Sequence, residues 1–202
     1  MTIAVEFIRA QGAAATGVLG AISIWARQTK STLHIPVSEA ASLSYDDPRI
    51  TSLLNSEQDL YVSNGIRKLG LASHQAGKHV DLVGILGFGL DIDAWGPLRA
   101  HGNLPQTKED VYAILGNCLP PTLIISTGTG ESIHAWWIFD KPKLIKDSSD
   151  LKKLRLISKN FHEQFHDRAK KLGFHLDATD KLNQWLRLPG TKNWKGVHAK
   201  SN

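Results

Sequence analysis

The chain has 202 residues, 42% of them hydrophobic and 21% charged, which is ordinary globular usage and allows one large domain or two small lobes. Its net charge of +5 is a mild surplus that is compatible with nucleic acid or another anionic partner without requiring one. The single cysteine, Cys118, excludes an internal disulfide and a zinc site built from several cysteines, so we expect no zinc.

The apolar segment nearest the N-terminus is the stretch to test for membrane insertion or export. Residues 13–24 are rich in Ala and Gly, but Gly17 and Gly20 interrupt them and no basic region precedes them. We therefore expect no signal peptide, no membrane partner and a cytoplasmic location.

The N-terminal part of the chain is predicted to combine helices with a hairpin. Two runs rich in β-branched and aromatic residues are separated by a short polar segment, which is typical of paired strands. Asp47 followed by Pro48 has the residue types of an N-cap and a first helical turn. The predicted elements are a helix over 4–11, strands over 21–27 and 32–37, and a helix from 48 to about 58.

The middle of the chain alternates strands with loops and one helix. Thr107 and Asp110 form a capping box, which predicts a helix from there to about residue 117. The other predicted elements are a strand over 60–63, an exposed basic loop over 65–78, a buried strand beginning at 81, and strands over 123–126 and 133–139.

The clearest helix is predicted over 149–172, where apolar residues recur at helical spacing and Gly173 supplies the C-cap. A short strand over 174–177 and a Pro189-Gly190 turn are expected to follow. Because strands and helices interleave with hairpins among them, the pattern favours an α+β fold over a doubly wound parallel sheet.

The segment Leu86 to Trp95 contains the first candidate site, a D-x-D pair formed by Asp91 and Asp93. Residues i and i+2 of a strand point to the same face, so the two carboxylates would project together and repel each other. A divalent cation such as Mg²⁺ or Mn²⁺ would remove that repulsion. Asp at a strand end also caps turns, so the pair alone is weak evidence for a metal site.

A Gly-rich loop provides the second candidate. Glycines let backbone N–H groups turn toward an anion, and hydroxyl groups add further donors. His134 begins the next strand and could donate to a phosphate oxygen, although a plain hairpin loop would have the same composition. The candidate phosphate-binding residues are Ser126, Gly128, Gly130, Ser132 and His134.

The third candidate lies near the C-terminus, where Asp177 or Asp180 could supply a third carboxylate. Arg187, Lys192 and Lys195 bring positive charge to the same region. A turn with a solvated basic tail would explain these residues equally well.

Two further pairs of residues are interpreted without a catalytic role. His162 and His166 stand four apart on the long predicted helix, and we expect both to be surface histidines rather than metal ligands. Trp136 and Trp137 alternate across one strand, so at least one is expected in the core, while the other could stack on a base or ribose.

Taken in order, the three candidate segments resemble the motif set of the archaeo-eukaryotic primase (AEP) superfamily, and specifically its primase-polymerase branch from plasmids, phages and mobile elements. The D-x-D motif is matched by Asp91 and Asp93, the S-x-H motif by Ser132 and His134, and the hydrophobic-Asp motif by Leu176 and Asp177. The string R-L-P-G-T-x-N-x-K over 187–195 is the most specific match.

The resemblance implies a single catalytic domain over 1–202, with a small N-terminal α/β lobe to about 58 and a catalytic lobe related to the RNA recognition motif over about 59–202. It implies that Asp91, Asp93 and Asp177 hold two Mg²⁺ or Mn²⁺ ions, with Asp177 favoured over Asp180 by the motif. His134, helped by Ser132, would contact the triphosphate, while Arg187 and Lys195 would contact nucleotide phosphates or the template backbone.

The implied activity is template-directed nucleotidyl transfer by a DNA primase-polymerase, with a DNA template and primer and NTP or dNTP substrates as partners. The sequence given ends soon after the last motif, so we expect it to lack the helical accessory domain and helicase that often follow in the family; either could be a partner. The alternatives are a catalytically silent nucleic-acid-binding replication-initiator module and a nuclease or nicking enzyme. Against the nuclease, no His-x-His pair or clustered catalytic tyrosine is present in the sequence.

Overall fold

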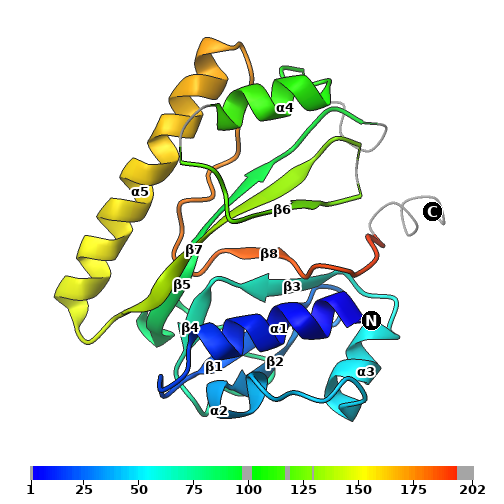
Figure 1. Cartoon of the computed structure of the whole chain (residues 1–202), viewed down its shortest axis with the longest axis vertical. Coiled ribbons are helices and arrows are strands. Elements are labelled where there is room, and N and C mark those ends of the chain that lie inside the picture. The colour runs from blue at the N-terminus through cyan, green and yellow to red at the C-terminus, as the bar shows by residue number, and fades with distance from the viewer. Residues whose placement is uncertain (1, 97–101, 117–118, 129, 195–202) are drawn as a thin grey trace.

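The computed structural model describes residues 2–96, 102–116, 119–128 and 130–194, and it arranges them as helices around one antiparallel sheet (Figure 1). The helices are α1 (Thr2–Ala14), α2 (Val37–Ala40), α3 (Pro48–Leu54), α4 (Lys108–Leu115) and α5 (Ser148–Lys171), with a 3₁₀ turn η1 (His79–Asp81). The strands are β1 (Ala21–Ala26), β2 (Ser31–Pro36), β3 (Leu60–Ser63), β4 (Gly65–Arg67), β5 (Leu82–Ile92), β6 (Leu123–Ser126), β7 (Ile133–Leu144) and β8 (Trp185–Arg187).

The sheet has the strand order β6-β7-β5-β4-β1-β3-β8, with β2 paired to β1 outside this path. Every pairing between these strands is antiparallel. The predicted α+β class is therefore confirmed. No helix in the described ranges has the length and apolar character needed to cross a membrane.

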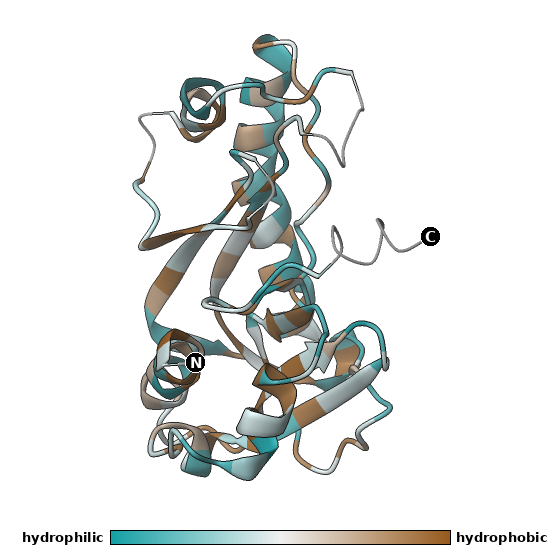
Figure 2. Cartoon of the chain, turned by 90° about the vertical axis from the view of Figure 1, so that its right-hand side faces the viewer, coloured by the Kyte–Doolittle hydropathy of each residue, from teal (hydrophilic) through white to brown (hydrophobic). Residues whose placement is uncertain are grey.

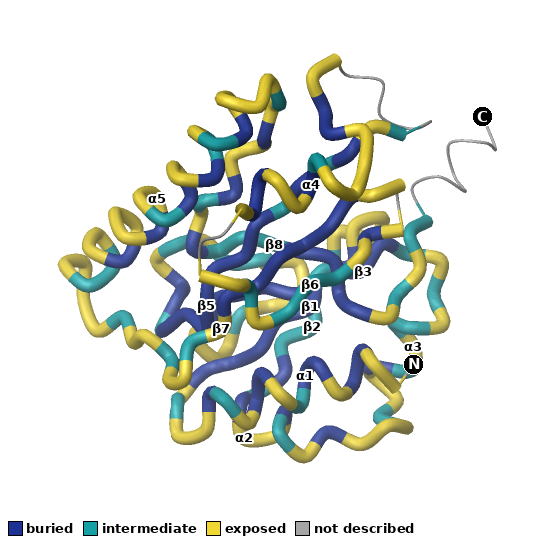
Figure 3. Tube along the Cα trace, turned by 45° about the horizontal axis from the view of Figure 1, so that its top comes forward, coloured by how far each residue is buried: buried dark blue, intermediate teal, exposed yellow. Residues whose placement is uncertain are grey.

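The long strands β5 and β7 separate two hydrophobic cores. On one face, Leu90 and Trp137 pack in a core with residues of α4 and α5. On the other face, Leu86 and Trp136 join the core that contains the buried side of α1. Hydrophobic residues follow the strands in Figure 2, and α5 alternates between buried and exposed positions in Figure 3. The sheet therefore has α4 and α5 on one side and the N-terminal helices on the other.

Several local predictions are confirmed. The capping box at the start of α4 is present, since the Thr107 side chain accepts from the Asp110 N–H and the Asp110 carboxylate accepts from the Thr107 N–H. Asp47 caps α3 by accepting from the Arg49 N–H. Strands β1 and β2 form the predicted hairpin, and Gly173 follows α5 with a φ of +82°. Short-range chemistry is sufficient to determine these features.

The prediction of a strand over 174–177 is wrong. Residues 174–180 have no regular secondary structure, and the strand near this end of the chain is instead β8, which pairs with β3. The helix predicted to run from 48 to about 58 ends at Leu54. Strand β8 ends two residues before Pro189 and depends on a partner far away in the sequence, so its local signal is weak.

The prediction of an exposed basic loop over 65–78 is also wrong at its beginning. Residues 65–67 form β4, and the Arg67 side chain is fully buried. Its Nε atom donates to the Ala76 carbonyl at 2.6 Å, and its guanidinium lies over the Trp185 ring. Burial lowers the pKa of Arg67 to about 10. This arginine organises the loop that follows it instead of facing solvent.

The interpretation of His162 as a surface residue is wrong, because this side chain is 2% exposed. Its Nε2 atom lies 3.0 Å from the Gly89 carbonyl oxygen, so it joins α5 to β5. His166 is half-buried, and burial lowers its pKa. Trp136 and Trp137 do lie on opposite faces, and both are buried, which confirms that at least one is in the core. Neither ring is exposed for stacking on a nucleotide.

Candidate active site

The end of β5 carries Asp91 and Asp93 toward the face of the sheet opposite to α4 and α5. Leu90, Ile92 and Ala94 are all buried in the core beneath those helices. Since side chains alternate along an extended chain, the two aspartates project to the other face, and both are half-buried.

His134 lies directly across from Asp91 in the register of β5 and β7. Its Nε2 atom is 3.5 Å from Asp91 Oδ1, and its Nδ1 atom accepts a hydrogen bond of 3.2 Å from the Arg187 N–H. A ring nitrogen that accepts a hydrogen bond carries no proton, so in the neutral ring the proton is on Nε2. The imidazole therefore directs its N–H edge toward the carboxylate.

Ser132, two residues before His134, is fully buried. Its Oγ atom accepts a hydrogen bond of 2.9 Å from the Ala94 N–H, which joins the start of β7 to the chain just after Asp93. The serine hydroxyl thus holds the D-x-D segment against the S-x-H segment.

We expect Ser132→Ala to lower the free energy of unfolding by about 1–3 kcal/mol, because the buried Ala94 N–H would lose its acceptor. Urea unfolding monitored by tryptophan fluorescence measures this change. Ser126→Ala, which removes an exposed hydroxyl, is the matched control. Equal midpoints for the two variants would show that the Ser132 bond contributes nothing.

The loop between β6 and β7 lies beside the D-x-D segment. Gly128 and Gly130 have φ angles of +75° and +58°, a region that favours glycine. A Cβ atom on Gly130 would lie 3.1 Å from the Trp95 carbonyl oxygen, so the loop passes close to the chain after Asp93. A cavity of about 360 Å³ lies between residues 126–128 and 191–194. Ser126 and Gly128 therefore meet the C-terminal basic segment at one cavity.

Arg187 is buried in β8, and its guanidinium is bound by Asp59. Nη1 lies 2.9 Å from Asp59 Oδ1, with the two side chains 7% and 2% exposed. The same carboxylate oxygen accepts the Trp194 N–H at 2.9 Å, and Arg187 also donates to the Lys192 carbonyl. This pair fixes residues 192–194 against the start of β3, while the Arg187 backbone holds His134.

The Asp59 carboxylate is ionised in this setting. Burial alone would raise its pKa, but hydrogen bonds from Arg187 and the Trp194 N–H, with the charge of Arg187, outweigh burial. The pKa of Asp59 therefore lies below its ordinary value.

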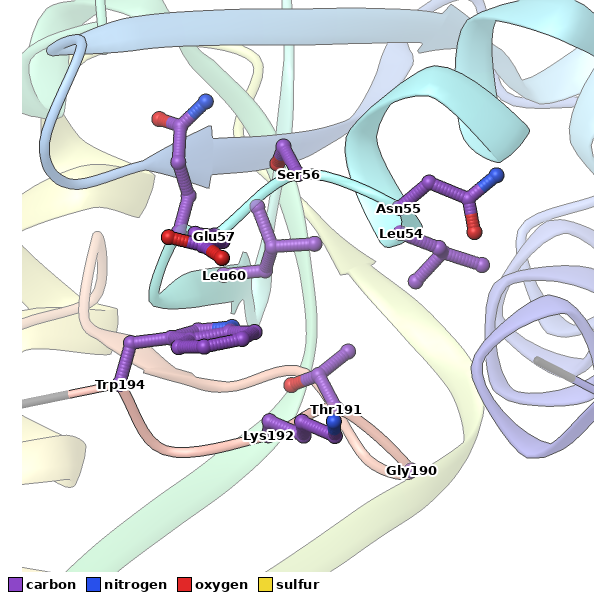
Figure 4. Close-up of a pocket in the computed structure, with 10 residues that line it drawn as sticks. Leu54, Asn55, Ser56, Glu57, Leu60, Gly190, Thr191, Lys192 and Trp194 are labelled. Carbon is purple, nitrogen blue, oxygen red and sulfur yellow. The ribbon is translucent and has the colours of Figure 1, made fainter. Parts of the chain in front are cut away.

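A second cavity, of about 420 Å³, lies on the other side of the 190–194 segment (Figure 4). The connection between α3 and β3 forms its other wall, and the Trp194 indole faces Leu60 and Glu57 across it. The segment that the Asp59–Arg187 pair fixes is thus shared by both cavities.

Asp177 is not gathered into the same group as Asp91 and Asp93. Its side chain is 67% exposed, and its Oδ1 atom lies 3.1 Å from His175 Nε2. Asp180 is half-buried and lines a different cavity beside α5. Within the described part of the chain, no three His, Cys, Asp or Glu side chains lie close enough to hold one metal ion. Lys195 lies outside the described residues.

Comparison with known proteins identifies the fold. No family model and no curated protein sequence matches the chain. A solved structure does match it, the AEP domain of the cyanophage S-2L primase-polymerase, with a TM-score of 0.54 and 13% sequence identity. The match covers 94% of this chain and 84% of that chain. The chain has a fold similar to that of this AEP domain.

Three residues at the site were given no specific role from the sequence. Lys192 and Asn193 lie inside the R-L-P-G-T-x-N-x-K string, so the sequence did carry a signal that they belong to the site. The Asn193 side chain donates to the Thr127 carbonyl at 3.2 Å. Asp59 had no sequence signal, because it is a lone aspartate before a strand. Only its contact with the distant Arg187 identifies it.

Proposed function

We propose that the chain is a DNA primase-polymerase that adds NTPs or dNTPs to a primer 3′-hydroxyl as directed by a DNA template. The observation that carries this proposal is the contact between Asp91 and His134 across β5 and β7. In a fold similar to that of a primase-polymerase domain, it sets a carboxylate and an imidazole N–H beside the Gly-rich loop. A carboxylate suits a cation, and the imidazole N–H suits a phosphate oxygen.

A divalent ion, Mg²⁺ or Mn²⁺, is part of this proposal. Mg²⁺ is usually held by one or two carboxylates together with substrate phosphates and water, and Asp91 and Asp93 would supply two. When bound, such ions activate the attacking hydroxyl and stabilise the leaving pyrophosphate. Asp177 is the third carboxylate of the proposal, and it would have to exchange its contact with His175 for the ion.

The triphosphate would lie along the Gly-rich loop. The His134 side chain is 6% exposed and its Nε2 lies 3.5 Å from Asp91 Oδ1, so its N–H would have to turn from Asp91 to donate to a phosphate oxygen. The exposed Ser126 hydroxyl and the backbone of Gly128 and Gly130 would lie beside that phosphate. Lys192, which lines the same cavity as Ser126, would add a positive charge. Arg187 would act by position, because its backbone holds His134 while its guanidinium binds Asp59.

We expect His134→Ala to raise the KM for nucleotide by about 10- to 100-fold with a smaller effect on kcat, since a hydrogen bond to a charged group contributes about 1.5–3 kcal/mol. Steady-state incorporation at increasing nucleotide concentration measures both constants. His74→Ala, at an exposed histidine, is the control. An unchanged KM with a reduced kcat would contradict the proposed phosphate contact.

A catalytically silent nucleic-acid-binding module is the second candidate. The exposed position of Asp177 favours it, because the described residues form no three-carboxylate group. Such a module would bind DNA and incorporate no nucleotide.

Incorporation of labelled nucleotide on a primed template tests the proposal. We expect extension products that require Mg²⁺ or Mn²⁺ and disappear with EDTA. DNA binding without incorporation under any of these conditions would favour the silent module.

A further inference from the structure

A second basic surface lies along α5, on the side of the sheet away from Asp91. Three cations of α5 and one from the loop before β8 surround a cavity of about 440 Å³, whose lining is His79, Lys152, Arg155, Leu156, Lys159, Asp180 and Lys181. We propose that this α5 cavity binds the phosphodiester backbone of nucleic acid at a contact separate from the candidate active site.

The spacing of the α5 cations supports the binding of a negatively charged ligand. Lys152, Arg155 and Lys159 follow one another at intervals of three and four residues, which places them on one face of the helix. Like charges at this spacing destabilise a helix, so the arrangement is not explained by folding. A negatively charged ligand would turn the mutual repulsion into attraction.

These charges are little neutralised by the protein. Lys159 is 3.6 Å from Glu163, whereas Lys152, Arg155 and Lys181 have no ion pair with any residue that the structure describes. Asp180 is the single carboxylate of the lining, against four cations. The cavity therefore keeps a positive surplus.

His79 lies in the same cavity lining as these cations. Its pKa is lowered, first by burial and then by the charges of Arg155 and Lys181, with Asp180 acting in the opposite direction. Its Nδ1 atom is buried and makes no hydrogen bond with the residues described. The charges of α5 and of the 180–181 segment thus converge on one point.

The partner is inferred from charge and extent. Lys152 to Lys159 spans about 10 Å of helix at 1.5 Å per residue, and successive phosphates of one duplex strand are about 3.4 Å apart along the axis. The row can therefore follow about three phosphates of one strand. The identification of the partner as DNA rests on the proposed function, whereas the need for a polyanion rests on the cavity alone.

The test is Lys152→Gln/Arg155→Gln, which removes two exposed cations from the cavity. Lys141→Gln/Lys170→Gln, at exposed positions outside the cavity, is the control with the same loss of charge. Binding of a fluorescein-labelled 20-base-pair duplex is measured by anisotropy from about 50 to 200 mM salt, the range over which phosphate contacts change affinity most. Thermal unfolding checks that both variants fold.

We expect the cavity variant to bind more weakly than the control and to lower the slope of log affinity against log salt by about 2, one for each lost phosphate contact. Equal affinities and slopes for the two folded variants would overturn the proposal, even if nucleotide incorporation were normal. A slope lowered only in the cavity variant would support it, even if the wild-type chain incorporated no nucleotide. Weaker binding of a free nucleoside triphosphate, with duplex binding unchanged, would also overturn it.

Discussion

Asp91→Ala and Asp93→Ala are each expected to abolish primer extension in Mg²⁺ or Mn²⁺. Each removes a carboxylate that we propose as a direct metal ligand, so the loss should exceed the roughly 10- to 100-fold effect of changing an outer-shell partner. Both positions are half-buried, Asp91 in β5 and Asp93 just after it, and neither belongs to the hydrophobic core. Labelled-nucleotide incorporation, with thermal unfolding to check folding, measures the effect.

Asp140→Ala is the control for this prediction, because Asp140 is an exposed carboxylate on β7, the strand that carries His134. Extension at the wild-type rate by either Asp91→Ala or Asp93→Ala would refute the polymerase assignment. Asp177→Ala separates two forms of the proposal. A loss as large as that of Asp91→Ala would mean that Asp177 leaves His175 to bind an ion, whereas normal activity would limit the site to the β5 carboxylates.

The parts of the fold that could be predicted depend on short-range chemistry. The apolar spacing of α5 and the Thr107 cap of α4 are visible within one segment of chain. Strand β8 has 3 residues and pairs with β3, so the interaction that makes it a strand lies outside any short segment of sequence around it. Arg67 was assigned to solvent because charge usually indicates exposure, yet carbonyl groups and the Trp185 ring make its burial possible.

The sequence predicted which residues belong to the site better than it predicted how they are arranged. The motifs named Asp91 and His134, but their contact depends on the register of β5 and β7, which the sequence leaves undetermined. The guanidinium of Arg187 was expected to meet phosphates, and its position against Asp59 depends on a contact across 128 residues of chain. Side-chain roles that require a partner from a distant segment are the ones that sequence patterns could not supply.

The buried pair of Asp59 and Arg187 is where we expect the largest loss of stability from one substitution. Asp59→Ala would leave the Arg187 guanidinium buried without its carboxylate, and removing one partner of such a pair costs about 3–5 kcal/mol. Urea unfolding measures the change in the free energy of unfolding. Because Asp59 also accepts the Trp194 N–H, and β8 holds His134, nucleotide incorporation should fall as well.

A double-mutant cycle and a pH series show whether the ion pair itself is responsible. If the two groups are coupled, Asp59→Ala/Arg187→Ala will be less destabilised than the sum of the single variants, and strict additivity would contradict the prediction.

The folded-state pKa of Asp59 lies below its ordinary value of 3.8, so the pair stabilises the fold above that pH and loses its contribution as the pH falls below it. Asp47, Asp81 and Asp110 also have lowered pKa values, so wild type will lose stability in acid for several reasons. The difference in unfolding free energy between wild type and Asp59→Asn isolates the pair, and it should shrink as the pH falls below about 4.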